Sequence, residues 1–265
     1  MNTQQPQVIG IVGGMGPEAG LSLFNGILSQ TRAAKDQDHL SAILMSFPAY
    51  ITDRTAFLEG HTRVNPAYAI AEVIARLEAA GATVVGIACN TAHAPLIYDT
   101  ILEEMDRYDS KVKLLHMPLE VGRFIALNYA GVRRVGVMAT NGTYKSGLYK
   151  KALESYGLEV IMPDSRLQQD VVHRMIYDPV FGLKATAGKI SAEVKLLLAK
   201  AVDFFRDRNT EALVLGCTEL SLLLQPGLSG SMIVVDSTRV LSAALVQEAT
   251  VAVAATPVLH AGCYS

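Results

Sequence analysis

Cysteine is scarce in this chain of 265 residues. The three cysteines stand far apart, at positions 89, 217 and 263, and none belongs to a Cys-x-x-Cys pair. Their odd number and wide spacing suit neither a disulfide framework nor a zinc site. The histidines at positions 39, 61, 116, 173 and 260 also lack the spacing of metal ligands. We therefore expect reduced thiols in a cytoplasmic protein and no bound metal.

The sequence also lacks an excess of charge of one sign. Its formal net charge is −2, and its lysines and arginines are scattered along the chain. Such a chain has no field that would gather nucleic acid or an anionic membrane. We expect neither of these partners and predict a small-molecule ligand instead.

Long apolar segments are absent as well. The first seven residues have neither the basic region nor the apolar stretch of a signal peptide. The apolar run over residues 241–255 is interrupted by Gln247 and Glu248, and it is shorter than the roughly 20 residues that a membrane span needs. We expect neither secretion nor membrane insertion.

The chain does contain short, nearly continuous apolar runs, each followed by small residues and a helical pattern. Such runs are typical of strands buried on both faces of a parallel sheet. They lie at residues 8–12, 42–45, 84–88, 113–115, 135–139, 212–215 and 233–235. Amphipathic stretches suited to crossover helices lie between them, at residues 65–80, 148–156 and 190–206. The pattern predicts a doubly wound α/β fold.

An internal similarity divides these elements into two sets. Segment 8–12 resembles segment 134–138, and segment 85–91 resembles segment 213–219 at nearly the same offset. Two similar lobes, each a mainly parallel sheet flanked by helices, explain both matches; the alternative is that strand-to-helix junctions look alike in any α/β protein. We expect a first lobe over residues 1–116, completed by a C-terminal helix over 237–265. The second lobe covers residues 117–236, and the active site lies in the cleft between the lobes.

Cys89 and Cys217 occupy matching places in these two segments. Each directly follows a predicted strand and precedes polar residues that can open a helix, which predicts a thiol at the carboxyl edge of each sheet. Open α/β sheets bind ligands at that edge, and nearby helix N-termini favour the reactive thiolate. A lone cysteine is usually a small buried hydrophobe, whereas two in equivalent contexts predict acid/base groups that invert one carbon from opposite faces. Cys263 has no such context.

Six motifs occur in the order found in a known family. They are GGMGP at 13–17, DRT at 53–55, CNTAH at 89–93, ATNGT at 139–143, GCTEL at 216–220 and DSTR at 236–239. In this ordered set the sequence resembles the aspartate/glutamate racemase family, from about residue 8 to residue 251. The resemblance implies an isomerase that inverts the α-carbon of a small acidic amino acid, with aspartate the first candidate and glutamate the second. It also implies catalysis without pyridoxal phosphate or another cofactor, and a homodimer.

The resemblance further implies roles for the matching residues. Cys89 and Cys217 would be the catalytic acid/base pair. The residues implied to hold the substrate α-carboxylate or to line the cleft beside it are Met15, Gly16, Asn90, Thr91, Thr143 and Thr218. The physical argument agrees, because loops at helix N-termini bind anions and a fixed carboxylate positions the α-carbon between the sulfurs.

Four further residues are candidates for the site, and for three of them the sequence leaves a structural alternative open. Arg54 matches the family arginine that holds the side-chain carboxylate, or it is an exposed loop arginine paired with its neighbouring aspartate. Lys184 matches a family lysine that approaches the site, or it is a solvent-facing helix lysine. His93 either tunes the Cys89 thiol or hydrogen-bonds to backbone, and Glu219 is placed to cap or orient the second cysteine junction.

Other functions compete with racemisation of an acidic amino acid. Residues 14–19 fit the GxGxxA fingerprint of a Rossmann-type NAD-dependent oxidoreductase, but Asp36 and Asp38 lie in a polar stretch and not at the end of a second strand. A broad-specificity amino-acid racemase, a non-catalytic binding protein and a decarboxylase of related acids are further alternatives. The presence of both cysteines favours racemisation.

Overall fold

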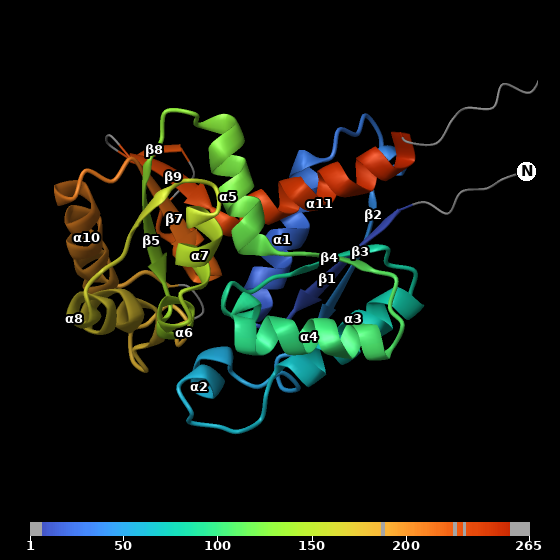
Figure 1. Cartoon of the computed structure of the whole chain (residues 1–265), viewed down its shortest axis with the longest axis horizontal. Coiled ribbons are helices and arrows are strands. Elements are labelled where there is room, and N and C mark those ends of the chain that lie inside the picture. Colours follow the sequence, from blue (N-terminus) through green and yellow to red (C-terminus); the bar gives the residue numbers. More distant parts are fainter. Residues whose placement is uncertain (1–6, 187–188, 225–226, 230–231, 255–265) are drawn as a thin grey trace, which may run out of the picture.

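Two mainly parallel sheets lie side by side, each covered by helices on both faces (Figure 1). The structure is a computed structural model that describes residues 7–186, 189–224, 227–229 and 232–254. The first sheet has the order β2-β1-β3-β4, and its strands all run parallel. These strands are β1 (Val8–Gly13), β2 (Ser41–Ser46), β3 (Val84–Ile87) and β4 (Lys113–Leu115).

The second sheet has the order β6-β5-β7-β9-β8. Its strands are β5 (Arg134–Ala139), β6 (Glu159–Ile161), β7 (Ala212–Gly216), β8 (Gly227–Ser229) and β9 (Met232–Asp236). Only the edge strand β8 runs antiparallel to its neighbour among the described strands of this sheet.

The two sheets share one topology, which confirms the internal similarity in the sequence. The neighbouring strands β1 and β3 of the first sheet correspond to β5 and β7 of the second, and these four strands carry the matched segments. All seven predicted strands are present. The strands β6 and β8 were not predicted, because a strand of three residues is too short to produce a recognisable apolar run.

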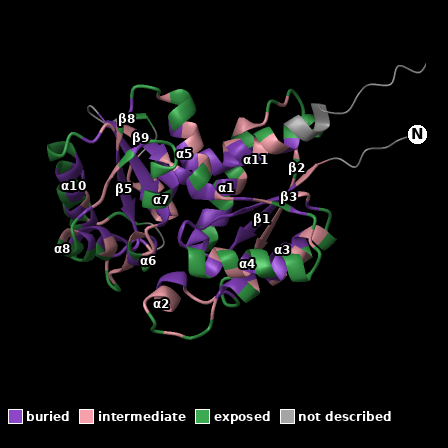
Figure 2. Ribbon diagram, viewed as in Figure 1, coloured by how far each residue is buried: buried purple, intermediate pink, exposed green. Residues whose placement is uncertain are grey.

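Helices bury the first sheet from both sides. Ile9 and Ile11 of β1 pack with α1 (Pro17–Gln30) and α11 (Ser237–Ala254), whereas Val12 points to the other face and packs with α3 (Ala67–Ala79) and α4 (Pro95–Arg107). Since successive side chains of a strand alternate between faces, a strand buried on both sides must be apolar throughout. Figure 2 shows this burial as purple strands beneath helices whose outer faces are exposed.

The second sheet is covered in the same way. One face packs against α5 (Met117–Asn128) and α7 (Leu148–Glu154). The other face packs against α10 (Ala192–Asp207), the π-helical turn η3 (Gln168–His173) and α9 (Arg174–Tyr177). The remaining short helices outside the site are η1 (Asp36–Asp38) and α8 (Ser165–Leu167).

The last described helix, α11, leaves the second sheet and packs on the first. Leu241 and Leu245 share a core cluster with Ile9 and Leu23, and α11 crosses from one sheet to the other in Figure 1. Residues 255–265 of the predicted C-terminal helix, and Cys263 with them, lie outside the described residues. We keep the division into residues 1–116 with 237–265, and 117–236, as a proposal. No helix within the described ranges is long and apolar enough to cross a membrane.

Candidate active site

Cys89 and Cys217 line one small cavity at the carboxyl ends of the central strands. Cys89 follows β3 and Cys217 follows β7, and both are almost fully buried. The cavity is lined by Met15, Arg54, Cys89, Asn90, Thr91, Thr140, Tyr177, Lys184, Cys217, Thr218 and Glu219. Its volume of about 10 Å³ has room for roughly one water molecule. The two sheets therefore meet around a closed site into which both thiols open.

The chain turns sharply after each of the two strands. The turn η2 (Thr91–His93) begins two residues after Cys89, and the turn η4 (Thr218–Leu222) begins directly after Cys217. Both turns present backbone N–H groups and threonine hydroxyls at the strand ends, where the cavity lies. The same local fold thus places a thiol and polar donors on both sides of the cavity.

Arg54 is the cation beside Cys89. It is the first residue of α2 (Arg54–Leu58), a helix capped by the Asp53 side chain, which accepts from the Ala56 N–H at 2.8 Å. The Arg54 side chain is buried, and burial acts to lower its pKa, but the nearby Cys89 and Asp53 outweigh burial and raise the pKa. The guanidinium is therefore a permanent positive charge at the first thiol.

The Arg54 guanidinium is only partly satisfied by the protein. Its Nη1 donates to the Thr52 carbonyl and its Nη2 to the Met15 carbonyl, each at 3.1 Å. Its Nε is buried and has no hydrogen-bond partner among the described residues. Because a buried unpaired donor is costly, this N–H is available to an anion in the cavity.

Glu219 and Lys184 form an ion pair beside Cys217. The Lys184 ammonium contacts one carboxylate oxygen of Glu219, and the Cys217 thiol donates to the other at 2.9 Å. Burial acts to raise the pKa of Glu219, but Lys184 and Cys217 lower it overall. Burial also acts to lower the pKa of Lys184, but Glu219 and Cys217 raise it. Burial and the Glu219 charge raise the pKa of Cys217 well above its ordinary value.

Threonine hydroxyls meet across the two lobes. The Thr91 hydroxyl lies 3.0 Å from the hydroxyl of Thr140 and 2.9 Å from that of Thr143. Thr140 precedes α6 (Asn141–Lys145) and caps it. The cluster joins the loop after β3 to the loop after β5 at the cavity wall.

The Asn90 amide also joins the two lobes. Its Oδ1 accepts from the Tyr149 hydroxyl, and its Nδ2 donates to the Ser237 hydroxyl at 3.1 Å. Ser237 in turn donates to the Leu215 carbonyl of β7 at 2.7 Å. Hydrogen bonds therefore connect Asn90, in the loop that carries Cys89, through Ser237 to Leu215 in β7, the strand that Cys217 follows.

Two further side-chain contacts join the lobes. The Tyr177 hydroxyl donates to Asp53 Oδ2 at 3.0 Å, and Lys145 forms an ion pair with Glu59 at 2.5 Å. Asp53 and Glu59 belong to the first lobe, whereas Tyr177 and Lys145 belong to the second. The space inside the cavity is smaller than an amino acid.

Comparison with known proteins identifies the family of this two-lobed fold. The sequence profile of the Asp/Glu/Hydantoin racemase family matches residues 12–245, well over half of the chain. The chain belongs to this family. A solved structure, the Picrophilus torridus aspartate racemase, is similar with a TM-score of 0.70 and 28% identity over 92% of this chain and 94% of that one.

Curated relatives of this racemase family match shorter stretches. The broad specificity amino-acid racemase RacX of Bacillus subtilis (strain 168) is 27% identical over 64% of this chain and 69% of that protein. The glutamate racemase of Aquifex aeolicus (strain VF5) is 31% identical over 60% of this chain, and the matched region spans 56% of that protein. The family and these relatives indicate an isomerase of the amino-acid racemase type, and they give the oxidoreductase alternative no support.

Most of the residues that the racemase family resemblance singled out meet at the cavity. Besides the two cysteines, the cavity is lined by Met15, Arg54, Asn90, Thr91, Lys184 and Thr218. Arg54 is 7% exposed, so the alternative of an exposed loop arginine is wrong in its exposure, although Arg54 does lie 4.0 Å from the Asp53 carboxylate with which that alternative paired it. Lys184 is held by Glu219 at the cavity, so the solvent-facing alternative is also wrong.

Two predicted residues lie outside the cavity lining. Gly16 caps the N-terminus of α1. Thr143 lies behind Thr91, and Thr140 takes the place at the wall because it precedes α6, whereas Thr143 lies within that helix.

Sequence reasoning assigned no role to Thr140 and Tyr177. The signal for Thr140 was present, since it directly follows a buried strand as the two cysteine loops do. Tyr177 ends α9, and only the packing of the two lobes brings its hydroxyl to Asp53.

His93 bonds to backbone and not to a thiol. Its Nδ1 lies 2.9 Å from the Cys89 carbonyl, and burial lowers its pKa to about 3, with a smaller contribution from His116. A neutral imidazole therefore supports the loop that carries Cys89. No group of three or more His, Cys, Asp or Glu side chains within the described ranges is arranged to hold a metal ion.

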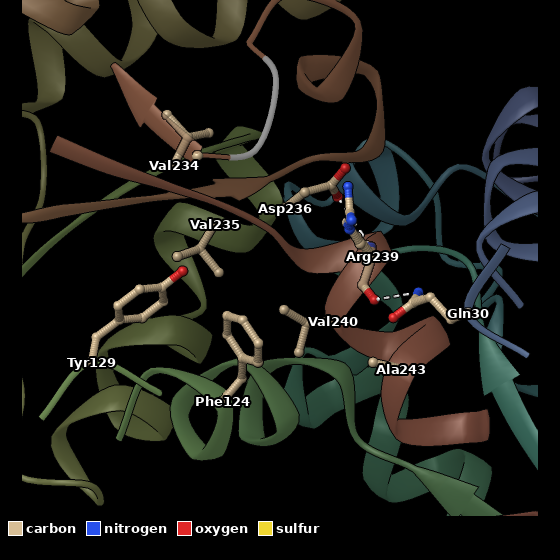
Figure 3. Close-up of a pocket in the computed structure, with 10 residues that line it drawn as sticks. Gln30, Phe124, Tyr129, Val234, Val235, Asp236, Arg239, Val240 and Ala243 are labelled. Atoms are coloured by element: carbon tan, nitrogen blue, oxygen red, sulfur yellow. Dashed lines mark hydrogen bonds between the residues drawn. The ribbon is translucent and has the colours of Figure 1, made fainter. Parts of the chain in front are cut away.

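A second, more open pocket lies away from both thiols. Figure 3 shows it between α1, α5, β9 and the start of α11, with a volume of about 300 Å³. Phe124, Tyr129 and Val240 supply apolar walls, and the Gln30 side chain donates to the Arg239 carbonyl at its edge. None of the predicted site residues lines this pocket, so its larger volume does not make it the active site.

Proposed function

We propose that this racemase-family protein inverts the α-carbon of a small acidic amino acid, aspartate first and glutamate second, with Cys89 and Cys217 as the two proton-transfer groups. The observation that carries the proposal is that both thiols open into one closed cavity from equivalent strand ends of two like sheets. One sulfur on each side of a bound α-carbon meets the geometric need of inversion, in which a proton leaves one face and another arrives at the opposite face.

The threonines and backbone N–H groups after the two cysteines would hold the substrate α-carboxylate. Thr91, Thr140 and Thr218 bring hydroxyl groups to the cavity wall, and the turns η2 and η4 begin beside them. Neutral donors suit this task because they fix the carboxylate between the sulfurs without adding charge to the cavity. The Asn90 amide is largely used by Tyr149 and Ser237, so we assign it a supporting contribution only.

Arg54 would hold the side-chain carboxylate of the substrate. Its unpartnered Nε and its permanent charge support this role, since a carboxylate can accept from it where the protein does not. Lys184 adds a second cation at the opposite end, balanced by Glu219. Among the residues that line the cavity, Lys184 is paired with Glu219, whereas Arg54 has no carboxylate partner, which supports its assignment to the side-chain carboxylate of the substrate.

We propose catalysis without pyridoxal phosphate. The lysine at the cavity, Lys184, is held as a cation by Glu219, which raises its pKa. A Schiff base requires the neutral amine, so the ion pair works against that chemistry. We also propose that the enzyme acts as a homodimer in the cytoplasm; sedimentation analysis of the purified protein tests the dimer.

Broad specificity is the second candidate function. The similarity to RacX, a broad specificity amino-acid racemase, favours it. The two candidates differ in their use of Arg54: a racemase for acidic amino acids depends on this cation for its choice of substrate, whereas a broad-specificity racemase also turns over uncharged side chains.

The deciding experiment incubates the protein with individual L- and D-amino acids in D₂O and follows α-deuterium incorporation by NMR and optical inversion by polarimetry. We expect exchange and inversion with aspartate, and the loss of inversion in both Cys89→Ser and Cys217→Ser. If no acidic amino acid incorporates deuterium at its α-carbon, the proposal is wrong. Comparable turnover of alanine or lysine would favour broad specificity.

A further inference from the structure

The two thiols of the cavity have different electrostatic surroundings. Cys89 lies beside Arg54, a buried cation. Cys217 lies beside the Glu219 carboxylate, whose other oxygen contacts Lys184. The near symmetry of the two sheets therefore does not extend to the charges that face the sulfurs, and the two sulfurs cannot hold their protons equally.

Both oxygens of the Glu219 carboxylate are fixed by specific contacts. One contacts the Lys184 ammonium, and the other accepts from the Cys217 thiol at 2.9 Å and from the Thr218 hydroxyl at 3.1 Å. The Glu219 side chain is 14% exposed and the Lys184 side chain 23% exposed, so neither side chain turns freely into solvent. A hydrogen bond from S–H to a carboxylate exists only while the sulfur carries its proton, and the Glu219 charge repels a thiolate.

We propose that Glu219, held in place by Lys184, is a positioning residue that keeps the proton on Cys217 in the resting enzyme, so that Cys89 is the thiolate that starts the reaction. This inference rests on the proposed racemase function and deepens it. It assigns the two thiols different resting states and gives Glu219 a role in the reaction.

The groups that face Cys217 from the elements around it support this assignment. Glu219 of η4 raises the pKa of Cys217 beyond the effect of burial, and Lys184 opposes it without overcoming it. Tyr149 of α7 is buried, which raises its own pKa, so that it faces the sulfur as a neutral phenol. On the other side of the cavity, the charged group beside Cys89 is the Arg54 guanidinium and not a carboxylate.

The proton balance of one turnover follows from these resting states. The Cys89 thiolate takes the proton from the α-carbon, the C–H bond breaks, and its electron pair remains on the α-carbon, which is stabilised by the adjacent carboxylate. That carbon then takes the proton of the Cys217 thiol on its other face. The product has inverted configuration, Cys89 is a thiol and Cys217 is a thiolate. After product release Cys217 takes a proton from water and Cys89 gives its proton to water, which restores the resting states with no net change in protons.

The test measures the Cys217 proton directly and without substrate. The double variant Cys89→Ser/Cys263→Ser leaves Cys217 as the only cysteine of the chain. Its thiolate absorbance is followed in the ultraviolet from about pH 6 to about pH 12, a range that extends well above the titration of an ordinary thiol, after subtraction of the same titration in the cysteine-free chain. Glu219→Gln and Lys184→Gln are then added separately, and circular dichroism verifies that each variant is folded.

We expect Cys217 to remain protonated at neutral pH in the double variant. Glu219→Gln keeps the size of the side chain but removes its charge, and it should move the titration to lower pH by about 1 to 3 units, the usual effect of a charge in contact. Lys184→Gln removes a positive charge that lowers the pKa of Cys217, so the titration of Cys217 should move to higher pH or out of the measured pH range. Opposite effects of the two changes distinguish a charge effect from simple loosening of the site.

Glu104→Gln is the matched control. Glu104 is also a buried glutamate with a cationic partner, Arg107, but it lies in α4 and not at the cavity. The control should leave the titration in place. A Cys217 thiolate at neutral pH in the double variant, an unmoved titration in Glu219→Gln, or a shift in the same direction in Glu219→Gln and Lys184→Gln would each overturn the inference. Since no substrate is used, these outcomes are independent of the D₂O exchange that tests the racemase function.

Discussion

Gly142 lies at a tight contact between the two lobes. It belongs to α6 of the second lobe and faces Thr55 and Thr91 of the first. A Cβ atom at this position would lie 2.8 Å from Thr91 Cγ2, 2.9 Å from Thr55 Oγ1 and 3.1 Å from Thr55 Cα. Carbon atoms in contact prefer about 3.5 to 4.0 Å, so Gly142→Ala inserts a methyl group into occupied space.

The added methyl group destabilises the arrangement in which the two lobes are in contact. Overpacking in a tight contact costs about 1 to 3 kcal/mol. The Thr91 methyl can rotate away, but Thr55 Cα is backbone and can retreat only if the lobes separate. If catalysis requires the closed cavity, a penalty of about 1.4 kcal/mol on closure lowers kcat/KM about tenfold.

The assay compares racemisation by Gly142→Ala and by Gly131→Ala, since a Cβ at Gly131 meets nothing within 4 Å. We expect the first variant to lose about tenfold in kcat/KM and the second to match the parent protein. Thermal unfolding of both variants shows whether each lobe is intact. Parental kinetics in a folded Gly142→Ala protein would refute the reasoning that closure against Gly142 accompanies catalysis.

Two further predictions concern Arg54 and His93. Arg54→Lys keeps the charge but removes the planar fork, and we expect kcat/KM for aspartate to fall about 10- to 100-fold; Arg76→Lys, at an exposed ion pair with Glu72, serves as the control and should have no effect. Undiminished aspartate turnover in Arg54→Lys would contradict the assigned role. Because the pKa of His93 is about 3 in the folded protein, the unfolded chain binds its proton first as the pH falls below about 6.5, and stability is lost on the acid side. This histidine should lower the free energy of unfolding by about 2 kcal/mol between pH 7 and pH 5 in urea titrations, and a His93→Gln variant with the same pH slope as the parent would speak against it.

The sequence predicted the strands well because each central strand is buried on both faces and must be apolar throughout. For the same reason, the cysteines could be assigned to strand ends without any tertiary information. The three-residue strands β6 and β8 left no such trace, because they contribute too few side chains to form a pattern.

The charges around the thiols depend on packing between segments that are distant in sequence. Lys184 reaches Glu219 only because the segment after α9 folds back toward the end of β7. Tyr177 reaches Asp53 only when the two lobes are together. Residue types and spacing suggested candidates at these positions. Only the three-dimensional structure placed Arg54 beside Cys89, and the Glu219–Lys184 ion pair beside Cys217.

Ser237 has a consequence for the role of the last described helix. Its hydroxyl links the Asn90 side chain, next to Cys89, to the backbone of Leu215, two residues before Cys217. Ser237 is the first residue of α11, a helix that supplies no residue to the cavity lining. A chain that ended before α11 would keep both cysteines but lose this connection between their surroundings.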